Sequence, residues 1–194
     1  MARAVIMAGG EGTRLRPFTH TIPKPLLPIG RKPVAQIIIE RLAAHGITDI
    51  IMSVGYAADI IRAYFQDGRR FGVRISYYHE REKLGTAGCL AHLPALRDEP
   101  FLVTNGDLLT DLDYRDLLAR HNADGAALTV ATRTQTVSLP YGVLEIAPPP
   151  PGAPSTRRVT GVREKPPIHI SAMQVFTRSR PAPSISFPAK GALT

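Results

Sequence analysis

A glycine-rich loop near the start of the chain has the residue types that bind an anion. Residues 9–16 read Gly-Gly-Glu-Gly-Thr-Arg-Leu-Arg and directly follow an apolar run. Because glycine has no β-carbon, the backbone N–H groups of such a loop can approach a phosphate closely. A plain structural turn would explain the glycines, but it would not explain Arg14 and Arg16 on the same loop. The sequence therefore predicts that this loop binds phosphate.

This loop differs from two common nucleotide-binding motifs. It lacks the lysine and the four-residue spacer of a Walker loop. In the dinucleotide-binding pattern G-x-G-x-x-G, the third glycine would fall on Leu15. The acidic residue that binds ribose in that pattern is also missing, since the second predicted strand ends at Ser53-Val54-Gly55. Both motifs are therefore excluded.

A lysine lies a short distance further along the chain, in the run Pro23-Lys24-Pro25-Leu26-Leu27-Pro28. Prolines on either side hold the segment extended and limit the positions that the ammonium group can reach. A single lysine is usually only solvated. Lys24, however, follows Arg14 and Arg16 after one short loop, so together they form a cluster of positive charge suited to a polyphosphate.

An aspartate ends the predicted strand at Phe101–Thr104, in the sequence Asn105-Gly106-Asp107. A carboxylate at the carboxyl end of a strand, facing a phosphate loop, is a suitable ligand for Mg²⁺. An aspartate that only caps the following turn is the alternative that the residues leave open.

Small residues form a further loop at Gly85-Thr86-Ala87-Gly88, where a helix is predicted to begin. Small side chains allow a flat ring to approach, and free N–H groups at a helix start can bind its edge. An ordinary helix N-terminus is an equally good explanation from the residues alone.

Predicted strands and helices alternate along the first part of the chain. Short apolar runs predict strands, and apolar residues at helical spacing predict helices. The predicted strands are residues 5–8, 49–54, 73–78, 101–104 and 126–131, and the predicted helices are residues 33–45, 60–65, 87–96 and 114–121. This alternation is typical of a parallel α/β sheet with helices on both faces, in which ligands bind beyond the carboxyl ends of the strands. The loops at residues 9–16, 85–88 and 105–107 all lie there, so we expect them to form one pocket.

The alternation of strands and helices ends after residue 132. Residues 141–146 and 157–163 are predicted to pair as a hairpin, joined by a loop that contains Pro148-Pro149-Pro150-Pro151. Four consecutive prolines cannot donate to a strand ladder, so this segment is expected to be a surface loop.

Composition narrows the class of protein. The chain has 194 residues, 44% of them hydrophobic, and a formal net charge of +8. No apolar run approaches the roughly eighteen residues of a membrane span, and the apolar run before the glycine loop is too short for us to expect a signal peptide. A single cysteine fits a reducing cytoplasm, where we expect the protein to act. The arginine pairs Arg69-Arg70 and Arg157-Arg158 are not interleaved with aromatic residues, so we do not expect nucleic acid as a partner. Since no apolar run is long enough to span a membrane, we do not expect a membrane as a partner either.

Two segments together resemble the signature of the sugar-1-phosphate nucleotidylyltransferases, also called NDP-sugar pyrophosphorylases. They are Met7–Pro17, which contains the glycine loop, and Pro23–Pro28. The resemblance continues through Leu84–Gly88, Asn105–Asp107, Tyr141–Val143 and Glu164–Pro166, and covers about residues 1–172. The form Leu-Gly-Thr-Ala-Gly resembles the guanylyl branch, such as mannose-1-phosphate guanylyltransferase, and the related uridylyl branch more than the thymidylyl branch.

This resemblance implies a fold and a reaction. The fold would be a three-layer, mostly parallel Rossmann-like sheet of the nucleotide-diphospho-sugar transferase type, truncated at its C-terminus. The enzyme would transfer a nucleotidyl group from an NTP, with a weak preference for GTP, to a sugar 1-phosphate. The products would be pyrophosphate and an NDP-sugar, a precursor of polysaccharides. Mg²⁺ would be the cofactor, and the intact family can form oligomers, which we do not expect of this chain.

The resemblance also implies roles for individual residues. Arg14, Lys24 and Asp107 would be catalytic, and Asp107 would bind the metal. Gly142, Glu164 and Lys165 would bind the sugar phosphate, although a Glu-Lys pair is more often a solvated ion pair. The nucleotide would be bound by Ala8, Gly9, Gly10, Gly12, Thr13, Gly85, Thr86, Ala87 and Gly88.

The resemblance stops near residue 172. The family continues with Asn-Ala-Gly-Ile-Tyr and later supplies a second metal-binding aspartate, whereas this chain continues Met173-Gln174-Val175-Phe176-Thr177. The codons of residues 172–177 permit the family sequence in a shifted reading frame. We therefore interpret residues 1–172 as an incomplete nucleotidyltransferase domain and residues 173–194 as a poorly ordered, frameshifted tail, a hypothesis that the coding DNA can test.

This ending has consequences for the whole chain. Without the later segments, we expect the sheet to lack a strand and to expose apolar surface, with low solubility and little turnover. The alternative function is therefore a catalytically inactive nucleotide-binding fragment or a regulatory partner.

Overall fold

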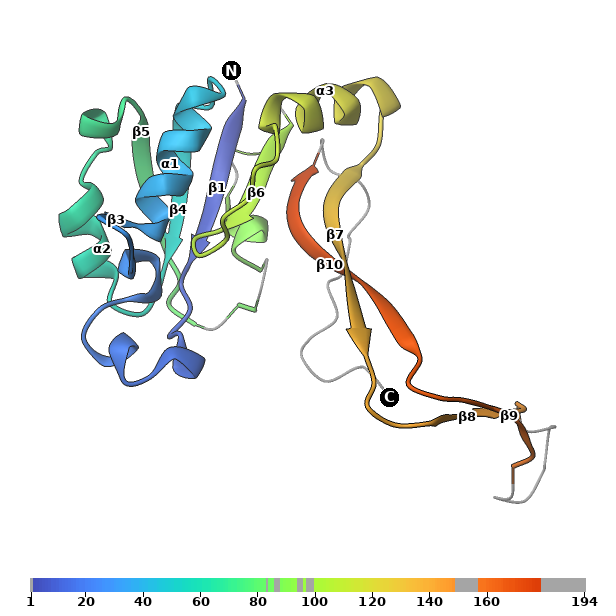
Figure 1. Ribbon diagram of the computed structural model, residues 1–194. Helices are drawn as coiled ribbons and strands as arrows, with labels where there is room; N and C mark the ends of the chain where they lie inside the picture. Colours follow the sequence, from blue (N-terminus) through green and yellow to red (C-terminus); the bar gives the residue numbers. More distant parts are fainter. Residues whose placement is uncertain are drawn as a thin grey trace. The chain divides into compact units, whose positions relative to one another are not determined.

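A computed structural model describes residues 2–82, 84–85, 88–93, 96, 100–148 and 157–178, with only the backbone given for residues 172–176 and 178. Its central feature is a six-stranded sheet with the strand order β5-β4-β1-β6-β10-β7. The four strands β5, β4, β1 and β6 are parallel, and β10 is antiparallel to β6 (Figure 1). The strands of this sheet are β1 (Arg3–Ala8), β4 (Asp49–Val54), β5 (Arg74–His79), β6 (Phe101–Asn105), β7 (Leu128–Ser138) and β10 (Pro167–Arg178).

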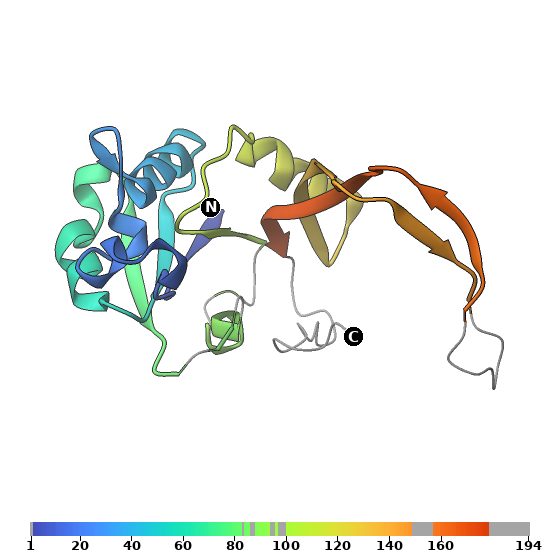
Figure 2. The same ribbon diagram turned by 60° about the horizontal axis from the view of Figure 1, so that its bottom comes forward.

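Buried side chains on the two faces of this sheet form two separate apolar clusters. On one face, Ala4, Ile50 and Leu102 lie in register on neighbouring strands and pack beneath three α-helices. On the other face, Val5, Ile51 and Val103 pack against the short 3₁₀ helix η5 (green in Figure 2). The helical elements are α1 (Val34–Ala44), α2 (Ala58–Phe65), α3 (Tyr114–Asp124) and η5 (Gly88–His92). Burial on both faces explains why these strands are continuous apolar runs in the sequence.

Short elements connect the first strand to α1. They are the 3₁₀ helices η1 (Thr13–Leu15), η2 (Phe18–His20) and η3 (Lys24–Leu26), followed by the antiparallel pair β2 (Pro28–Ile29) and β3 (Lys32–Pro33). One further 3₁₀ helix, η4 (Arg69–Phe71), precedes β5. The residues between the glycine loop and α1 therefore form a chain of tight turns, which returns Lys24 toward the sheet.

The described chain forms two compact units. The first contains the residues up to Ala131 together with the segment that begins at Gln174, and the second spans Thr132–Met173. The second unit contains the predicted hairpin, formed by β8 (Val143–Ile146) and β9 (Val159–Arg163) as an antiparallel pair. Strands β7 and β10 each run from one unit into the other.

Most predicted elements are confirmed, and two predictions were wrong. Among the described residues, the helix predicted for residues 87–96 is a 3₁₀ helix at Gly88–His92, and it ends before Leu93, where the following Pro94 disfavours helical geometry. The sheet was expected to lack a strand after residue 172, but β10 continues to Arg178, and Val175–Arg178 pair with β6. Val175, Phe176 and Thr177 are residue types that favour strands, which is sufficient for pairing whatever their origin. Residues 179–194 of the predicted tail lie outside the described residues.

Among the described residues, no helix is long and apolar enough to cross a membrane.

A carboxylate at the start of β4 makes the stability of the fold depend on pH. Arg3 Nε donates to Asp49 Oδ2 at 2.6 Å, and Arg74 Nη2 lies 3.2 Å from the same oxygen. Burial opposes ionisation of Asp49, but the hydrogen bonds from Arg3 and Arg74 outweigh it and hold its pKa below the ordinary value of 3.8. The ionised carboxylate therefore stabilises the fold above the ordinary pKa, and this contribution is lost as the pH falls through the lowered, folded-state pKa.

We expect the variant Asp49→Asn to melt at a lower temperature than the wild type at pH 7. The difference should shrink as the pH is lowered below about 4, because the wild-type carboxylate then becomes protonated too. Thermal melts followed by circular dichroism across this pH range measure the effect, with the exposed Asp111→Asn as the control. A melting difference that does not change with pH would contradict this account.

Candidate active site

The glycine loop leaves the carboxyl end of β1 between the ends of its two neighbouring strands. On one side, the N–H of Tyr56 donates to the carbonyl of Gly9 at 3.3 Å, and a β-carbon on Gly55 would lie 2.9 Å from that carbonyl oxygen. On the other side, the N–H of Gly106 donates to the carbonyl of Met7 at 2.8 Å. The turns after β4 and β6 therefore hold the start of the loop in place, as predicted for ligand-binding loops at this edge of a parallel sheet.

Gly12 has a left-handed backbone conformation, with φ of +62°, and caps the start of η1. A β-carbon on it would lie 2.9 Å from Cγ2 of Thr19 and 3.2 Å from Cβ of Lys24. Both the conformation and the close neighbours therefore require glycine at this position. By contrast, a β-carbon on Gly10 would meet no atom within 4 Å among the described residues, so this part of the loop faces open space.

The structure brings Lys24 and Asp107 together, although they are far apart in the sequence. Lys24 Nζ forms an ion pair with Asp107 Oδ2, and both side chains are about one third exposed (34% and 32%). Lys24 comes from η3 and Asp107 follows β6. The predicted phosphate-binding lysine and the predicted metal ligand thus share one edge of the sheet with the glycine loop.

The residues at this edge fit a metal that is bound jointly by protein and phosphate. The described residues contain no group of three or more His, Cys, Asp or Glu side chains that could hold a metal ion by themselves. Mg²⁺ commonly binds through one or two carboxylates, with phosphate oxygens and waters completing its shell. Asp107, partly exposed beside a phosphate loop, is a carboxylate of this kind.

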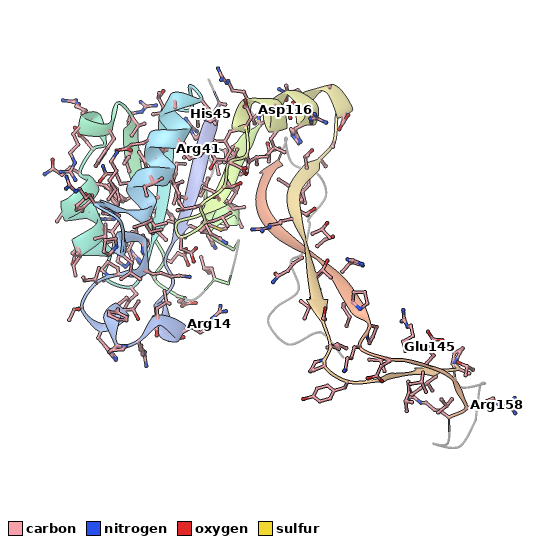
Figure 3. The ribbon with its side chains drawn as sticks, viewed as in Figure 1. Arg14, Arg41, His45, Asp116, Glu145 and Arg158 are labelled. Atoms are coloured by element: carbon pink, nitrogen blue, oxygen red, sulfur yellow. The ribbon has the colours of Figure 1, made fainter. Side chains whose placement is uncertain are left out.

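The two loop arginines differ in their partners. Arg16 Nη2 lies 3.8 Å from Glu11 Oε2, so it turns back toward its own loop. Arg14 is exposed on η1, and the structure shows no ion pair for it among the described residues (Figure 3). Arg14 is therefore the loop arginine that can reach an anion without first breaking an ion pair.

The three residues predicted to bind the sugar phosphate lie close together within the second unit. Gly142 precedes β8 and Glu164 follows β9, and a β-carbon on Gly142 would lie 3.1 Å from Glu164 Oε2. Lys165 has a φ of +44°, and its Nζ lies 4.0 Å from Glu164 Oε1. Pairing of β8 with β9 is what brings Gly142 next to Glu164.

The predicted base-binding loop is described only in part. Gly85 has a φ of +76°, and Gly88 begins η5. Thr86 and Ala87 lie outside the described residues.

Glu80 is a residue of this edge that the sequence analysis missed. It directly follows β5, its N–H donates to the carbonyl of Val54 at 2.8 Å, and its Oε1 accepts a hydrogen bond from Ser53 Oγ at 2.6 Å. A β-carbon on Gly9 would lie 3.1 Å from Glu80 Oε1, so the carboxylate contacts the glycine loop. The signal that identified Asp107, an acidic residue at the carboxyl end of a strand, applies equally to Glu80 and could have found it.

Cys89 lies in the same region and is only 2% exposed, so its side chain packs in the core. Burial raises the pKa of its thiol. A hydrogen bond with Ser53 acts in the opposite direction, and the negative charge of Glu80 adds to the rise. The thiol therefore stays protonated at neutral pH.

Comparison with protein families identifies the family to which this chain belongs. The sequence model described as "Nucleotidyl transferase" matches residues 3–175. The chain belongs to the nucleotidyl transferase family. The match extends past residue 172 and ends inside β10.

Two curated relatives are similar to this chain over most of its length. The chain is 41% identical to a UTP–glucose-1-phosphate uridylyltransferase of Synechocystis sp. and 40% identical to a mannose-1-phosphate guanyltransferase of Schizosaccharomyces pombe. Each alignment covers 73% of this chain and 40% of the relative. The chain therefore spans about two fifths of the length of these curated relatives.

Solved structures show the same fold. A putative glucose-1-phosphate thymidylyltransferase from Bacillus anthracis matches with a TM-score of 0.69 at 25% identity, over 92% of this chain and 72% of its own. HddC from Yersinia pseudotuberculosis, complexed with GMP-PN, matches with a TM-score of 0.66 at 27% identity, over 92% and 77%. The predicted α/β fold of the nucleotide-diphospho-sugar transferase type is thereby confirmed.

Proposed function

We propose that this chain is the nucleotide-binding part of an enzyme that transfers a nucleotidyl group from an NTP to a sugar 1-phosphate. The observation that carries the proposal is the convergence of Gly12, Lys24 and Asp107 at one edge of the sheet, in a member of the nucleotidyl transferase family. A polyphosphate needs close backbone N–H groups and fixed positive charge, and this edge supplies both.

The proposed reaction is an in-line displacement at the α-phosphorus. An oxygen of the sugar phosphate forms a bond to that phosphorus, and the bond to the bridging oxygen of pyrophosphate breaks. Catalysis then consists mainly of positioning and charge stabilisation. Arg14 and Lys24 would bind the α-phosphate and the departing pyrophosphate, and Gly10, Gly12 and Thr13 would cradle the triphosphate.

We propose that Asp107 holds Mg²⁺ together with oxygens of the triphosphate. When bound, the metal would supply positive charge beside the phosphates. Lys24 would compete with the metal for the Asp107 carboxylate, because its Nζ is paired with one of the carboxylate oxygens.

The sugar 1-phosphate is proposed to bind through the residues gathered at the base of the β8–β9 hairpin. Glu164 accepts hydrogen bonds and so suits sugar hydroxyls, whereas Lys165 suits the phosphate. Gly142 leaves room beside Glu164 for the ring. We further propose that the enzyme acts in the cytoplasm and supplies precursors for polysaccharide synthesis.

We propose that the base of the nucleotide is guanine and that Glu80 is the residue that selects guanine over uracil. Guanine carries two neighbouring donors, N1–H and the 2-amino group, which a carboxylate can accept together. Uracil carries one N–H between two carbonyl oxygens, and these oxygens repel a carboxylate. Glu80 is fixed by Ser53 beside Gly9, and its negative charge acts on Cys89 near the start of η5. One relative is named a uridylyltransferase and another a guanyltransferase, so both uracil and guanine occur as bases within the family.

We expect Glu80→Gln to weaken GTP binding by about tenfold, because a charge-assisted hydrogen bond is replaced by a neutral one. UTP binding should change by less than about threefold or improve, since the amide can donate to a uracil carbonyl. Titration calorimetry with both nucleotides measures the two affinities. An equal loss of affinity for GTP and for UTP would show that Glu80 supports the glycine loop but does not recognise the base.

The proposed function is tested with the purified chain, each of the two nucleotides, and mannose or glucose 1-phosphate. Nucleotide-dependent thermal stabilisation reports binding, and pyrophosphate release reports turnover. Both together support the transferase. Stabilisation without pyrophosphate release would identify a nucleotide-binding fragment or regulatory partner instead, and the absence of both would overturn the proposal.

A further inference from the structure

Thr19 is a buried polar residue between exposed neighbours. It is 2% exposed, whereas Phe18 beside it in η2 is 69% exposed. The Thr19 hydroxyl donates to the carbonyl oxygen of Gly12 at 2.9 Å. The single buried residue of η2 is thus directed at the phosphate loop.

The carbonyl that Thr19 binds is fixed by two hydrogen bonds. Besides the Thr19 hydroxyl, the N–H of Leu15 donates to the same Gly12 oxygen at 2.9 Å. In a trans peptide the C=O and N–H groups point in opposite directions across one plane. Fixing the Gly12 carbonyl therefore also fixes the direction of the Thr13 N–H, which points to the opposite side of the peptide.

The methyl group of Thr19 makes a separate contact with the same glycine. A β-carbon on Gly12 would lie 2.9 Å from Thr19 Cγ2 and 3.2 Å from Lys24 Cβ, so the two side chains enclose the glycine. Thr19 thus supplies a hydroxyl to the carbonyl and a methyl to the α-carbon. Serine keeps only the hydroxyl, valine keeps only the apolar shape, and alanine keeps neither, so the two contributions can be separated.

We propose that Thr19 is a positioning residue of the triphosphate site, which holds the Gly12–Thr13 peptide so that its N–H faces the bound phosphates. The proposal rests on the proposed function of the loop. In it, Thr19 orients the Gly12–Thr13 peptide without itself contacting the nucleotide. The hydroxyl is the essential group, and the methyl contributes mainly to the stability of the turn.

The test compares variants that differ only in the hydroxyl or only in the methyl group. The affinity for inorganic tripolyphosphate, which contains no base, is measured by calorimetry, and stability by thermal melts. We expect Thr19→Val and Thr19→Ala to bind tripolyphosphate about tenfold more weakly than the wild type, and Thr19→Ser to bind within about twofold of it. The matched control is Thr21→Val, which removes the exposed hydroxyl that bonds to Phe18 O at 3.5 Å.

The serine and alanine variants keep the proposal falsifiable even if Thr19→Val does not fold, because both lack the methyl group. Equal affinities of Thr19→Ser and Thr19→Ala would overturn it, even if both melt earlier than the wild type. Weakening by Thr21→Val to the same extent as Thr19→Val would also overturn it. If wild-type chain binds neither tripolyphosphate nor nucleotide, the proposed function fails, and this inference fails with it.

Discussion

Replacement of Lys24 by methionine is expected to weaken NTP binding by about 10- to 100-fold. Methionine keeps a flexible side chain of similar length, so the change removes the charge and retains much of the packing beside Gly12. The loss follows from the removal of the fixed positive charge that faces the loop. Calorimetry with GTP and UTP measures it.

The same substitution should strengthen the binding of a metal in the absence of nucleotide. In the wild type, a cation competes with the Lys24 ammonium group for Asp107 and is repelled by its charge. A partly exposed ion pair contributes up to about 1 kcal/mol, so Mn²⁺, used as a paramagnetic probe for Mg²⁺, should bind up to roughly fivefold more tightly to Lys24→Met. Opposite changes in the two affinities are a result that simple destabilisation cannot produce.

The control for this experiment is Lys32→Met. Lys32 Nζ pairs with Glu40 Oε2 at 2.7 Å on the exposed surface of α1, so the substitution removes an ion pair outside the site. Neither affinity should change in this variant. If Lys24→Met weakens metal and nucleotide binding together, Lys24 does not compete with the metal for Asp107.

Replacement of Gly12 by alanine is the second change with a large expected effect. A φ of +62° costs an L-residue about 1–2 kcal/mol, and the new β-carbon would press on Thr19 and Lys24. Since both neighbours are held by other contacts, we expect the loop to move. A hydrogen bond to a charged group contributes about 1.5–3 kcal/mol, so displacement of the N–H groups that bind the phosphates should weaken NTP binding by on the order of 10- to 100-fold.

Gly30 offers a matched control for Gly12. It has nearly the same backbone conformation, with φ of +63°, but a β-carbon there would meet no atom within 4 Å among the described residues. Gly30→Ala should therefore lower the melting temperature, because alanine disfavours a positive φ, and it should leave the nucleotide affinity unchanged. Weak nucleotide binding by both variants would mean that the effect comes from general destabilisation.

The parts of the fold that could be predicted are those governed by local patterns. β1, β4 and β6 are buried on both faces, so their apolar runs identify them without any knowledge of the topology. The proximity of the glycine loop and Asp107 followed from a general rule, since loops at the carboxyl ends of neighbouring parallel strands meet at one edge. The ion pair itself depends on η3, which no sequence pattern indicated.

The parts that could not be predicted depend on contacts between distant residues. Glu80 contributes to the site because Ser53, on the neighbouring strand, donates a hydrogen bond to it. Thr19 is buried only because the turns of η1 and η2 fold it against Gly12. Strand β10 was missed because the resemblance to the family ends within it, whereas pairing with β6 requires only an extended segment.

The position of the only cysteine gives this chain a reporter of its own. Cys89 is the sole thiol in the sequence and lies buried beside Ser53 and Glu80. Thiol reagents attack the thiolate, so a buried and protonated Cys89 reacts only when the structure opens locally. A base that binds against Glu80 would hold that region closed. If the proposed base site is correct, the rate at which Cys89 is labelled would therefore report its occupancy, without any engineered probe.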